Sequence, residues 1–462
     1  MRYVSTRGSA PELGFADTLL AGLAADGGLY VPAAWPTLPA IDPSAGYAAA
    51  AAAVMAPYLG DEIDRAVLET ICADAYAAPQ SFRHPAVCPL VQLGPDEWLL
   101  ELFHGPTLAF KDMALQVVGR LFDHVLAQRG ERVTVVGATS GDTGSAAIDA
   151  MAGRSNVDIV ILYPAGRVSE VQRRQMTTVA AENVQAVAVE GTFDDCQDLV
   201  KAMFNDPAFR DQQHLSAVNS INWARVMAQI VYYATTAATF GGRPVSFAVP
   251  TGNFGNVLAG WIALRTGAPI HRLLIGSNCN DILTRFLTTR IMTTADVVST
   301  LSPSMDIQVS SNFERLLFEV NDRDGGMTAE QLRQLRATGH LAVEADQYEE
   351  WLAPVFRGAR FDDPDTLEIM RAVHDETGLL VDPHTAVGIG AARAAREPGL
   401  ATVALATAHP GKFPDAVEEA TGRRPELPPH LADLLARPER TTVVANDLAA
   451  VEAVVARHGA RR

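Results

Sequence analysis

The sequence of 462 residues has little lysine, few cysteines and no basic run longer than two residues. Its 37 Lys and Arg stand against 54 Asp and Glu, so the formal net charge is −17. Binding to nucleic acid needs clustered positive charge, which this composition lacks. We therefore expect a small-molecule partner and no nucleic acid.

Insertion into a membrane and secretion are also not expected. The longest uncharged stretch includes residues 247–264 and contains PTGNFGN, whose glycines and asparagines would expose unpaired backbone to lipid. The N-terminus has no basic segment followed by an apolar one, so it does not resemble a signal peptide.

The four cysteines are far apart in the sequence, form no CxxC pair and have no histidine at metal-ligand spacing. They are Cys72, Cys88, Cys196 and Cys279. This usage excludes a disulfide framework, predicts no metal site and favours a reduced, cytoplasmic compartment.

Length and hydrophobic content predict a folded protein of two or three domains. Hydrophobic residues make up 48% of the chain, which is ample for a core, and about 150 residues per domain is typical. Residues 1–85 have mostly helical spacing of apolar residues and predict an N-terminal domain. Residues 86–430 predict the main region, and the polar, proline-rich residues 431–462 predict a C-terminal tail.

Within the main region, short apolar runs alternate with amphipathic stretches, which is typical of βα units and a mainly parallel sheet. We expect two open α/β subdomains, the smaller at about 105–230. Between about 281 and 371 the alternation fades and charged helical sequence takes over, so we predict a helical insertion. The predicted fold class is α/β, with an additional, mostly helical N-terminal domain.

Only three of the 37 basic residues are lysines, namely Lys111, Lys201 and Lys412. Arginine stays protonated, so chemistry that needs a neutral amine falls to these three. Lys201 lies among acidic residues on a predicted helix, as a solvated lysine does. Lys111 follows apolar residues at a helix start, where desolvation would make it a Schiff-base amine, unless it is an ordinary surface lysine. Lys412 follows AHPG, in a loop or at a helix start near a site.

Two segments share one plan, in which an apolar strand is followed by a turn rich in Gly, Asn, Thr and Ser and then by a helix. The turns are TSGDTGS after VTVVGA and TGNFGN after VSFAVP. Each turn places backbone N–H groups at a helix N-terminus, which favours an anion, although ordinary βα turns share this composition. Neither turn is a Walker A or GxGxxG sequence. One activatable lysine and two anion-binding turns match what pyridoxal phosphate and an amino-acid substrate need.

Several longer motifs resemble those of threonine synthases, a family of fold-type II pyridoxal-phosphate enzymes. In order along the chain they are YVSTRG, GLAADGGLYVP, HGPTLAFKD, ATSGDTGSAA, NSINWARVMAQIVYY, PTGNFGNVLAGW, SSNFERLLFE, DPHTAVG and ATAHPGKF. The resemblance covers nearly the whole chain and implies the fold of tryptophan synthase β, with pyridoxal 5'-phosphate as cofactor. It also implies a lyase that converts O-phospho-L-homoserine and water to L-threonine and phosphate in threonine biosynthesis, acting as a monomer or homodimer.

The resemblance also assigns roles to individual residues. Lys111 matches the lysine that forms the Schiff base with the cofactor and then moves protons, and Thr407 matches the residue whose hydroxyl faces the pyridine nitrogen. The loop for the cofactor phosphate is expected at Gly252, Asn253, Phe254, Gly255 and Asn256. The turn for the substrate carboxylate is expected at Thr139, Ser140, Gly141 and Thr143. The site for the substrate's own phosphate is expected at Asn219, Ser220 and Arg225.

Asp142 departs from the wider superfamily, in which many members have an asparagine that contacts the phenolic oxygen of the cofactor. An ionised aspartate would repel a phenolate, so we expect Asp142 either to be protonated or to face elsewhere, and we keep it among the cofactor-binding residues. Four further residues either line the pocket or serve packing and helix capping. They are His104, Ser311, Asn312 and Arg315.

Two other functions remain open at this point. A pyridoxal-phosphate-dependent serine or threonine dehydratase keeps Lys111 and both turns, but it predicts no role for Arg225. A catalytically silent module that binds a phosphate metabolite predicts no Schiff base at Lys111.

Overall fold

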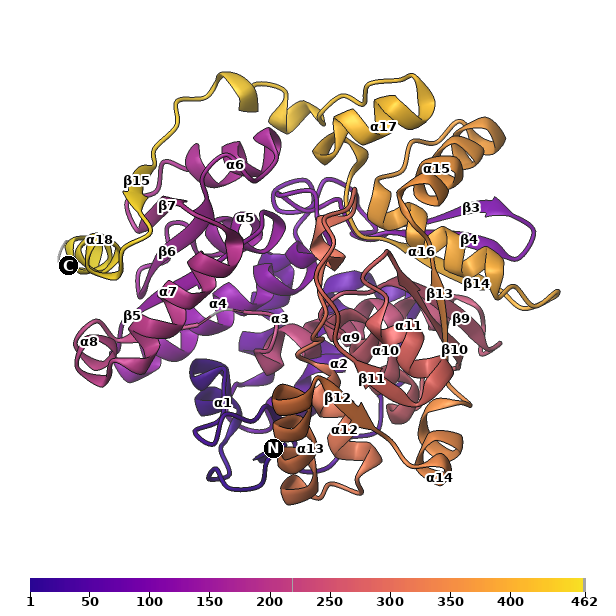
Figure 1. The fold of residues 1–462 in the computed structure, drawn as a ribbon, viewed down its shortest axis with the longest axis horizontal. Coiled ribbons are helices and arrows are strands. Elements are labelled where there is room, and N and C mark those ends of the chain that lie inside the picture. Colours follow the sequence, from indigo (N-terminus) through magenta and orange to yellow (C-terminus); the bar gives the residue numbers. More distant parts are fainter. Residues whose placement is uncertain (218, 460–462) are drawn as a thin grey trace.

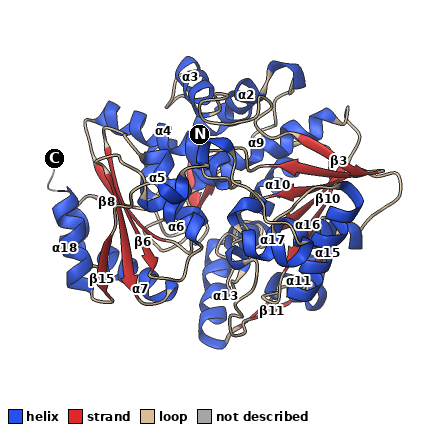
Figure 2. Cartoon of the chain, turned by 90° about the horizontal axis from the view of Figure 1, so that it is seen from above, coloured by secondary structure: helices blue, strands red, loops and turns tan. Residues whose placement is uncertain are grey.

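The computed structural model describes residues 1–217 and 219–459 and contains two α/β lobes, each built on its own sheet (Figure 1). Viewed from above, the two sheets lie on opposite sides of the molecule, each flanked by helices (Figure 2). The predicted fold class, α/β with mainly parallel sheets, is confirmed. Among the described residues, no helix combines the length and apolar content needed to cross a membrane.

The smaller lobe contains a five-stranded parallel sheet of order β15-β7-β6-β5-β8. Its strands are β5 (Val133–Ala138), β6 (Val157–Pro164), β7 (Val184–Glu190), β8 (Leu215–Ser216) and β15 (Thr442–Ala445). Its helices are α4 (Lys111–Arg129), α5 (Asp142–Met151), α6 (Glu170–Thr177), α7 (Phe193–Asn205), α8 (Pro207–Gln212) and α18 (Leu448–Gly459). Every residue of β6 is buried, which explains its nearly continuous apolar sequence, because a parallel sheet is covered on both faces.

The larger lobe contains a six-stranded sheet of order β13-β10-β9-β14-β4-β3, in which only β3 is antiparallel to its neighbour. Its strands are β3 (Leu90–Gly94), β4 (Glu97–Glu101), β9 (Val245–Pro250), β10 (Ile270–Ser277), β13 (Phe356–Arg360) and β14 (Thr402–Ala406). The main helices of this part of the chain are α9 (Trp223–Thr239), α10 (Gly255–Thr266), α11 (Ile282–Thr289), α12 (Phe313–Val320), α13 (Gly325–Thr338), α15 (Asp363–Thr377), α16 (Pro383–Ala394) and α17 (Pro414–Thr421).

The N-terminal segment consists of a two-stranded antiparallel sheet and three α-helices, and it packs on both lobes. Its elements are β1 (Tyr3–Ser5), α1 (Phe15–Ala21), β2 (Tyr30–Pro32), α2 (Tyr47–Leu59) and α3 (Arg65–Ala75). Helix α2 packs on α9, and α3 packs on α4. Trp223 donates its indole N–H to the Tyr3 hydroxyl (3.0 Å), which itself donates to the Tyr58 carbonyl (2.6 Å). This buried chain of bonds fixes the start of α9.

The prediction of a helical insertion at about 281–371 was wrong for the strands in that segment. Besides helices, it holds a two-stranded antiparallel sheet and β13, which forms an edge of the main sheet beside β10. The strands of this small sheet are β11 (Ile291–Thr293) and β12 (His340–Ala342), and the segment also contains the short helix α14 (Ala345–Gln347). The sequence FRGAR of β13 has no apolar run, because Arg357 and Arg360 are exposed at this edge.

The prediction of a C-terminal tail at 431–462 was wrong as well. Strand β15 pairs with β7 of the smaller lobe, and α18 buries Val451, Val454 and Val455 in the same core as β6 and β7. Val443 in β15 is 60% exposed and the strand has only 4 residues, so its apolar run is shorter than those by which the interior strands are recognised. Residues 442–459 therefore belong to the smaller lobe.

Candidate active site

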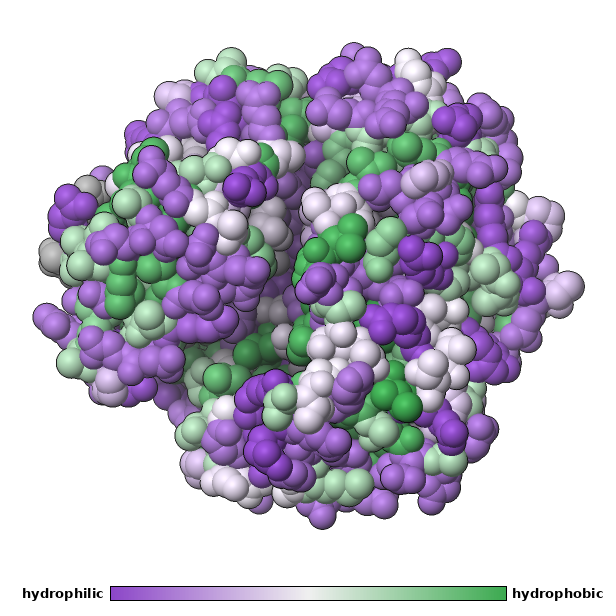
Figure 3. All heavy atoms as spheres, viewed as in Figure 1, coloured by the Kyte–Doolittle hydropathy of each residue, from purple (hydrophilic) through white to green (hydrophobic). Residues whose placement is uncertain are grey.

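The candidate residues come together at the carboxyl ends of strands from both sheets, where ligands bind in open α/β folds. The turn 139–143 follows β5, the loop 252–256 follows β9, and Thr407 follows β14. The surface is hollowed where the two lobes meet (Figure 3). Two loops from opposite lobes therefore face one region.

Lys111 is the first residue of α4, and its side chain is 12% exposed. The Lys111 segment lies beside the continuation of β14, because Phe110 N–H donates to the Thr407 carbonyl (2.8 Å) and Ala109 bridges to Ala408. Burial lowers the pKa of the Lys111 amine to about 8, and the nearby cations Arg225 and Lys412 act in the same direction, while Asp142 opposes them. A substantial part of this amine is therefore neutral near physiological pH.

Asp142 faces two lysines. Its Oδ2 lies 3.7 Å from Lys111 Nζ, and its Oδ1 lies 2.7 Å from the Nζ of Lys412. Burial raises the pKa of this carboxyl group, but Lys412 and Lys111 outweigh burial and hold the pKa well below its usual range. The lowered pKa speaks against a protonated Asp142, whose nearer partner is Lys412 rather than Lys111. How Asp142 lies relative to the phenolic oxygen of the cofactor stays a prediction.

The glycine-rich loop after β9 is tightly held by its neighbours. Phe254 has a left-handed backbone (φ 64°), and α10 begins at the next residue. The carbonyl of Gly252 accepts from Ser310 Oγ (2.5 Å), and a Cβ at Gly252 would lie 2.7 Å from the Ser304 carbonyl oxygen.

The carbonyl of Asn253 accepts from the backbone N–H (3.1 Å) and Nδ2 (3.2 Å) of Asn312. In Asn256, Oδ1 accepts from the hydroxyls of Tyr232 (2.6 Å) and Tyr233 (2.8 Å), whereas the buried Nδ2 has no partner. The loop is thus fixed by hydrogen bonds, and the buried side-chain amide of Asn256 remains without a partner.

Arg225, in the first turn of α9, is 4% exposed, and its Nε and Nη1 have no hydrogen-bond partner. Burial lowers the pKa of its guanidinium to about 10. A buried cation without an anionic partner is costly, so this position fits an incoming anion. The neighbouring Asn219 is exposed, and its Oδ1 accepts from the N–H of Ile221 (3.3 Å). Ser220 is half-buried, and its carbonyl accepts from Nδ2 of Asn312 (3.0 Å).

In the turn after β5, the Thr139 hydroxyl points into the turn itself. Its Oγ1 accepts from the N–H groups of Gly141 (3.0 Å) and Gly144 (2.8 Å). At Gly141 (φ 139°) a Cβ would lie 2.4 Å from the side chain of Gln172, so glycine is needed there. Ser140 and Thr143 are half-buried, which leaves their hydroxyls as the accessible ones of this turn.

Sequence reasoning did not include Lys412, Gln172, Ser304 and His384 among the site residues. Gln172 Nε2 and Ser304 Oγ donate to the two oxygens of Asp142 (2.9 and 3.3 Å). His384, buried beside them, accepts the Ser304 N–H at Nε2 (3.2 Å). The rarity of lysine was the one signal that singled out Lys412.

Two of the four residues expected either to line the pocket or to serve packing have partners in the protein. His104 pairs with Glu101 (2.7 Å), and Arg315 donates to the carbonyls of Tyr30 (3.0 Å) and Ile221 (2.6 Å).

These residues fit pyridoxal phosphate on grounds of structure alone. The site offers a buried amine with a lowered pKa, a buried arginine with two unused N–H groups, and a glycine loop opening a helix. An aldehyde needs the first of these, and phosphate groups need the others. Among the described residues, no group of His, Cys, Asp and Glu has the arrangement of a metal site.

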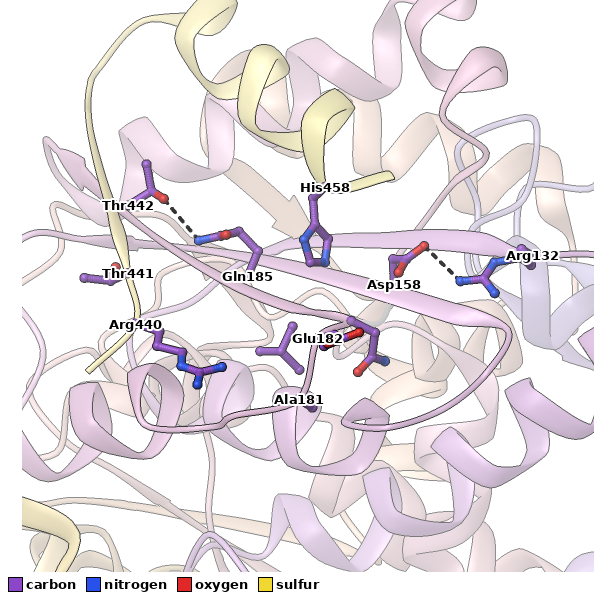
Figure 4. Close-up of a pocket in the computed structure, with 11 residues that line it drawn as sticks. Arg132, Asp158, Ala181, Glu182, Gln185, Arg440, Thr441, Thr442 and His458 are labelled. Carbon is purple, nitrogen blue, oxygen red and sulfur yellow. Dashed lines mark hydrogen bonds and ion pairs between the residues drawn. The ribbon is translucent and has the colours of Figure 1, made fainter. Parts of the chain in front are cut away.

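A separate cavity of about 660 Å³ lies in the smaller lobe, at the opposite ends of its strands (Figure 4). Arg132, Asp158, Gln185 and His458 point toward it from β5, β6, β7 and α18 and their flanking residues. None of the predicted site residues lines this cavity.

Comparison with known proteins gives consistent matches along the chain. Residues 2–76 match the family described as threonine synthase N terminus, residues 87–351 match pyridoxal-phosphate-dependent enzymes, and residues 385–455 match the threonine synthase C-terminal family. The threonine synthase of Pseudomonas aeruginosa is 52% identical over 100% of this chain and 99% of its own length.

Two solved structures are similar over almost the whole chain. The pyridoxal-phosphate-bound threonine synthase from Brucella melitensis has a TM-score of 0.96 and 51% identity, and covers 99% of both chains. The yeast threonine synthase has a TM-score of 0.92 and 38% identity, over 100% of this chain and 99% of its own.

Proposed function

The chain belongs to the threonine synthase family, and from this membership and the geometry of the site we propose that it converts O-phospho-L-homoserine and water to L-threonine and inorganic phosphate. Its cofactor is pyridoxal 5'-phosphate. The observation that carries the proposal is Arg225, a buried cation near Lys111 that has two N–H groups without a partner.

The cofactor would be held by residues of both lobes. Lys111 would supply the amine, the N–H groups of Gly252–Asn256 at the start of α10 would bind the cofactor phosphate, and the hydroxyl of Thr407 would serve the pyridine nitrogen. When bound, pyridoxal phosphate supplies an aldehyde that condenses with amines and a ring that accepts electrons from substrate carbons. A hydroxyl partner leaves the ring nitrogen unprotonated, which makes the ring a milder electron acceptor than a carboxylate partner would.

The substrate would be bound at its two anionic ends. The N–H groups and accessible hydroxyls of Ser140 and Thr143 receive the α-carboxylate at the N-terminus of α5. Arg225 receives the phosphate at Cγ, with Asn219 and Ser220 beside it. Because a guanidinium binds phosphate through two parallel N–H donors, Arg225 both orients the substrate and stabilises the departing dianion.

Lys111 moves the protons. As a neutral amine it takes the Cα proton, and as an ammonium group it returns protons to substrate carbons. In the overall reaction the Cγ–O bond breaks and phosphate leaves, one Cβ proton is lost and one proton is gained at Cγ. The hydroxyl of water forms a bond to Cβ, and the remaining water proton ends on the released phosphate. The lowered pKa of Lys111 suits both directions of transfer, since neither protonation state is strongly favoured near neutral pH.

We place this activity in the cytoplasm and propose a monomer or homodimer as the active form. The four cysteines are free, as expected in a reducing compartment. Light scattering of the purified protein separates the two oligomeric states.

The test follows phosphate and threonine together. Purified protein with pyridoxal phosphate is incubated with O-phosphohomoserine, and phosphate release is compared with threonine formation by chromatography. We expect equal amounts of both products, and activity toward serine and threonine far below that toward O-phosphohomoserine. Ammonia and a 2-oxo acid from serine or threonine, with no threonine from O-phosphohomoserine, would instead identify a dehydratase. Absence of any turnover would leave a phosphate-binding module.

A further inference from the structure

Lys412 is the most deeply buried of the three lysines, with none of its side chain exposed. Its Nζ lies 2.7 Å from Asp142 Oδ1 and donates to the Thr107 carbonyl at 2.8 Å. Lys111 lies farther from the same carboxylate, at 3.7 Å from Oδ2. The two lysines therefore compete for one carboxylate, and Lys412 holds the shorter contact.

Two further side chains hold the Asp142 carboxylate in this orientation. Gln172 donates to the same oxygen as Lys412, and Ser304 donates to the oxygen that faces Lys111. These bonds fix the carboxylate plane, so Asp142 cannot turn toward Lys111 without breaking them. The charged groups that act on Lys111 are Asp142 of α5, Arg225 of α9 and Lys412, which follows β14, and His384 acts on Asp142 from α16.

We propose that Lys412 is a positioning residue that engages Asp142, so that Lys111 keeps only a long ion pair and remains free to react with the cofactor and the substrate. The inference rests on the proposed function, because it takes Lys111 as the cofactor-binding amine. It also gives a physical reason for the aspartate, since a buried carboxylate at position 142 is compatible with the site only when a second cation offsets its charge.

Without Lys412, the nearest cation to Asp142 is Lys111. Replacement by methionine keeps the length of the side chain and removes its charge. The negative charge of the carboxylate, still held in place by Gln172 and Ser304, then acts on Lys111 without a competing lysine, which stabilises the ammonium form and lowers the fraction of reactive amine. Replacement of Asp142 by asparagine acts in the opposite direction, because it removes the anion that favours the ammonium form.

The experiment measures the reactivity of Lys111 in the full-length protein freed of cofactor. Formaldehyde with a borane reductant methylates neutral amines, and mass spectrometry quantifies each lysine against pH from 6 to 10. Lys201 serves as internal reference, because it is 65% exposed on α7, far along the chain from the site. Circular dichroism and urea unfolding of each variant establish that it is folded.

We expect Lys412→Met to slow the methylation of Lys111 at pH 7 by about tenfold or more, which corresponds to about one unit of pKa, with Lys201 unchanged. We expect Asp142→Asn to accelerate it, and the double variant Asp142→Asn/Lys412→Met to return within about threefold of the unmodified protein, since both opposing influences are gone.

An unchanged or faster rate in folded Lys412→Met would overturn the inference. If that variant does not fold, Asp142→Asn decides alone, and an unchanged or slower rate there would overturn the inference. None of these rates depends on turnover. A protein that makes threonine but shows no change at Lys111 refutes the role of Lys412 only, whereas a protein that makes no threonine refutes the proposed function.

Discussion

Replacing Arg225 by methionine should have opposite effects on stability and on activity. Arg225 is 4% exposed, and its Nε and Nη1 have no hydrogen-bond partner. The folded apoprotein therefore carries a desolvated positive charge whose lost hydration these two nitrogens do not recover. Methionine fills similar space without that charge. We expect the free energy of unfolding of the apoprotein to rise by about 1–3 kcal/mol, as when buried charges elsewhere are replaced by apolar residues.

The loss of activity is estimated from the two unused donors. Hydrogen bonds to charged groups are worth about 1.5–3 kcal/mol each, so two of them contribute about 3–6 kcal/mol to binding the phosphate in the transition state. The variant should therefore lose about 10²–10⁴ in kcat/KM for O-phosphohomoserine. Inorganic phosphate should raise the unfolding midpoint of the unmodified protein more than that of the variant.

Urea unfolding of the apoproteins and steady-state kinetics test both halves. Arg315→Met is the matched control, because Arg315 is 1% exposed but donates to Tyr30, Ile221 and Asn312. That variant should be destabilised by about 3–5 kcal/mol, since its bonded partners lose their donors. A loss of stability in Arg225→Met similar to that in Arg315→Met would refute the reasoning, because it would mean that Arg225 already has partners in the apoprotein.

Three further predictions concern the lysine, the acid side of the pH profile and the C-terminus. Lys111→Ala should remove both threonine formation and the visible absorbance of bound cofactor. In the unmodified apoprotein, the rate of pyridoxal phosphate addition should rise with pH through about 8 and then level off, because the neutral amine reacts. A rate independent of pH between 6 and 9 would contradict this. Burial, aided by His104, lowers the pKa of His409 from 6.5 to about 4. As the pH falls from 6.5 toward 4, the unfolded chain takes up a proton at His409 before the folded protein does, so the free energy of unfolding decreases by up to about 3 kcal/mol. The urea midpoint of His409→Gln should depend less on pH in that window. Truncation after residue 441 removes β15 and the buried valines of α18, and it should lower the free energy of unfolding by roughly 5 kcal/mol. An unchanged urea midpoint would show that these residues are dispensable for stability.

The interior strands were predictable because burial on both faces demands apolar sequence. Strand β6, with every residue buried, is such a case, and the turns after β5 and β9 could be read from their glycines. The edge strands β13 and β15 could not be read in this way, since one side of each lacks a neighbouring strand and their sequences need no apolar run. The information that places them is the partner strand, which lies far away in the sequence.

The site was predictable in its types of residue and not in its contacts. Lys111 stood out because lysine is rare and its neighbours are apolar. The pairing of Asp142 with Lys412 joins residues 270 positions apart, and no local pattern indicates which of the two lysines the carboxylate prefers. Thr139 was assigned to the substrate, although its hydroxyl is engaged within its own turn, because a threonine at that position serves either purpose.

The position of β14 at the centre of the larger sheet affects how the protein is made. Strand β4 leaves the ribosome early, but it contacts β9 only through β14, which is synthesised about 300 residues later. The larger sheet therefore stays divided until almost the whole chain has emerged. Pairing over such separations is slow, and the unpaired edges of β4 and β9 are exposed in the meantime to association with other chains. The larger sheet is thus assembled only near the end of synthesis or after it.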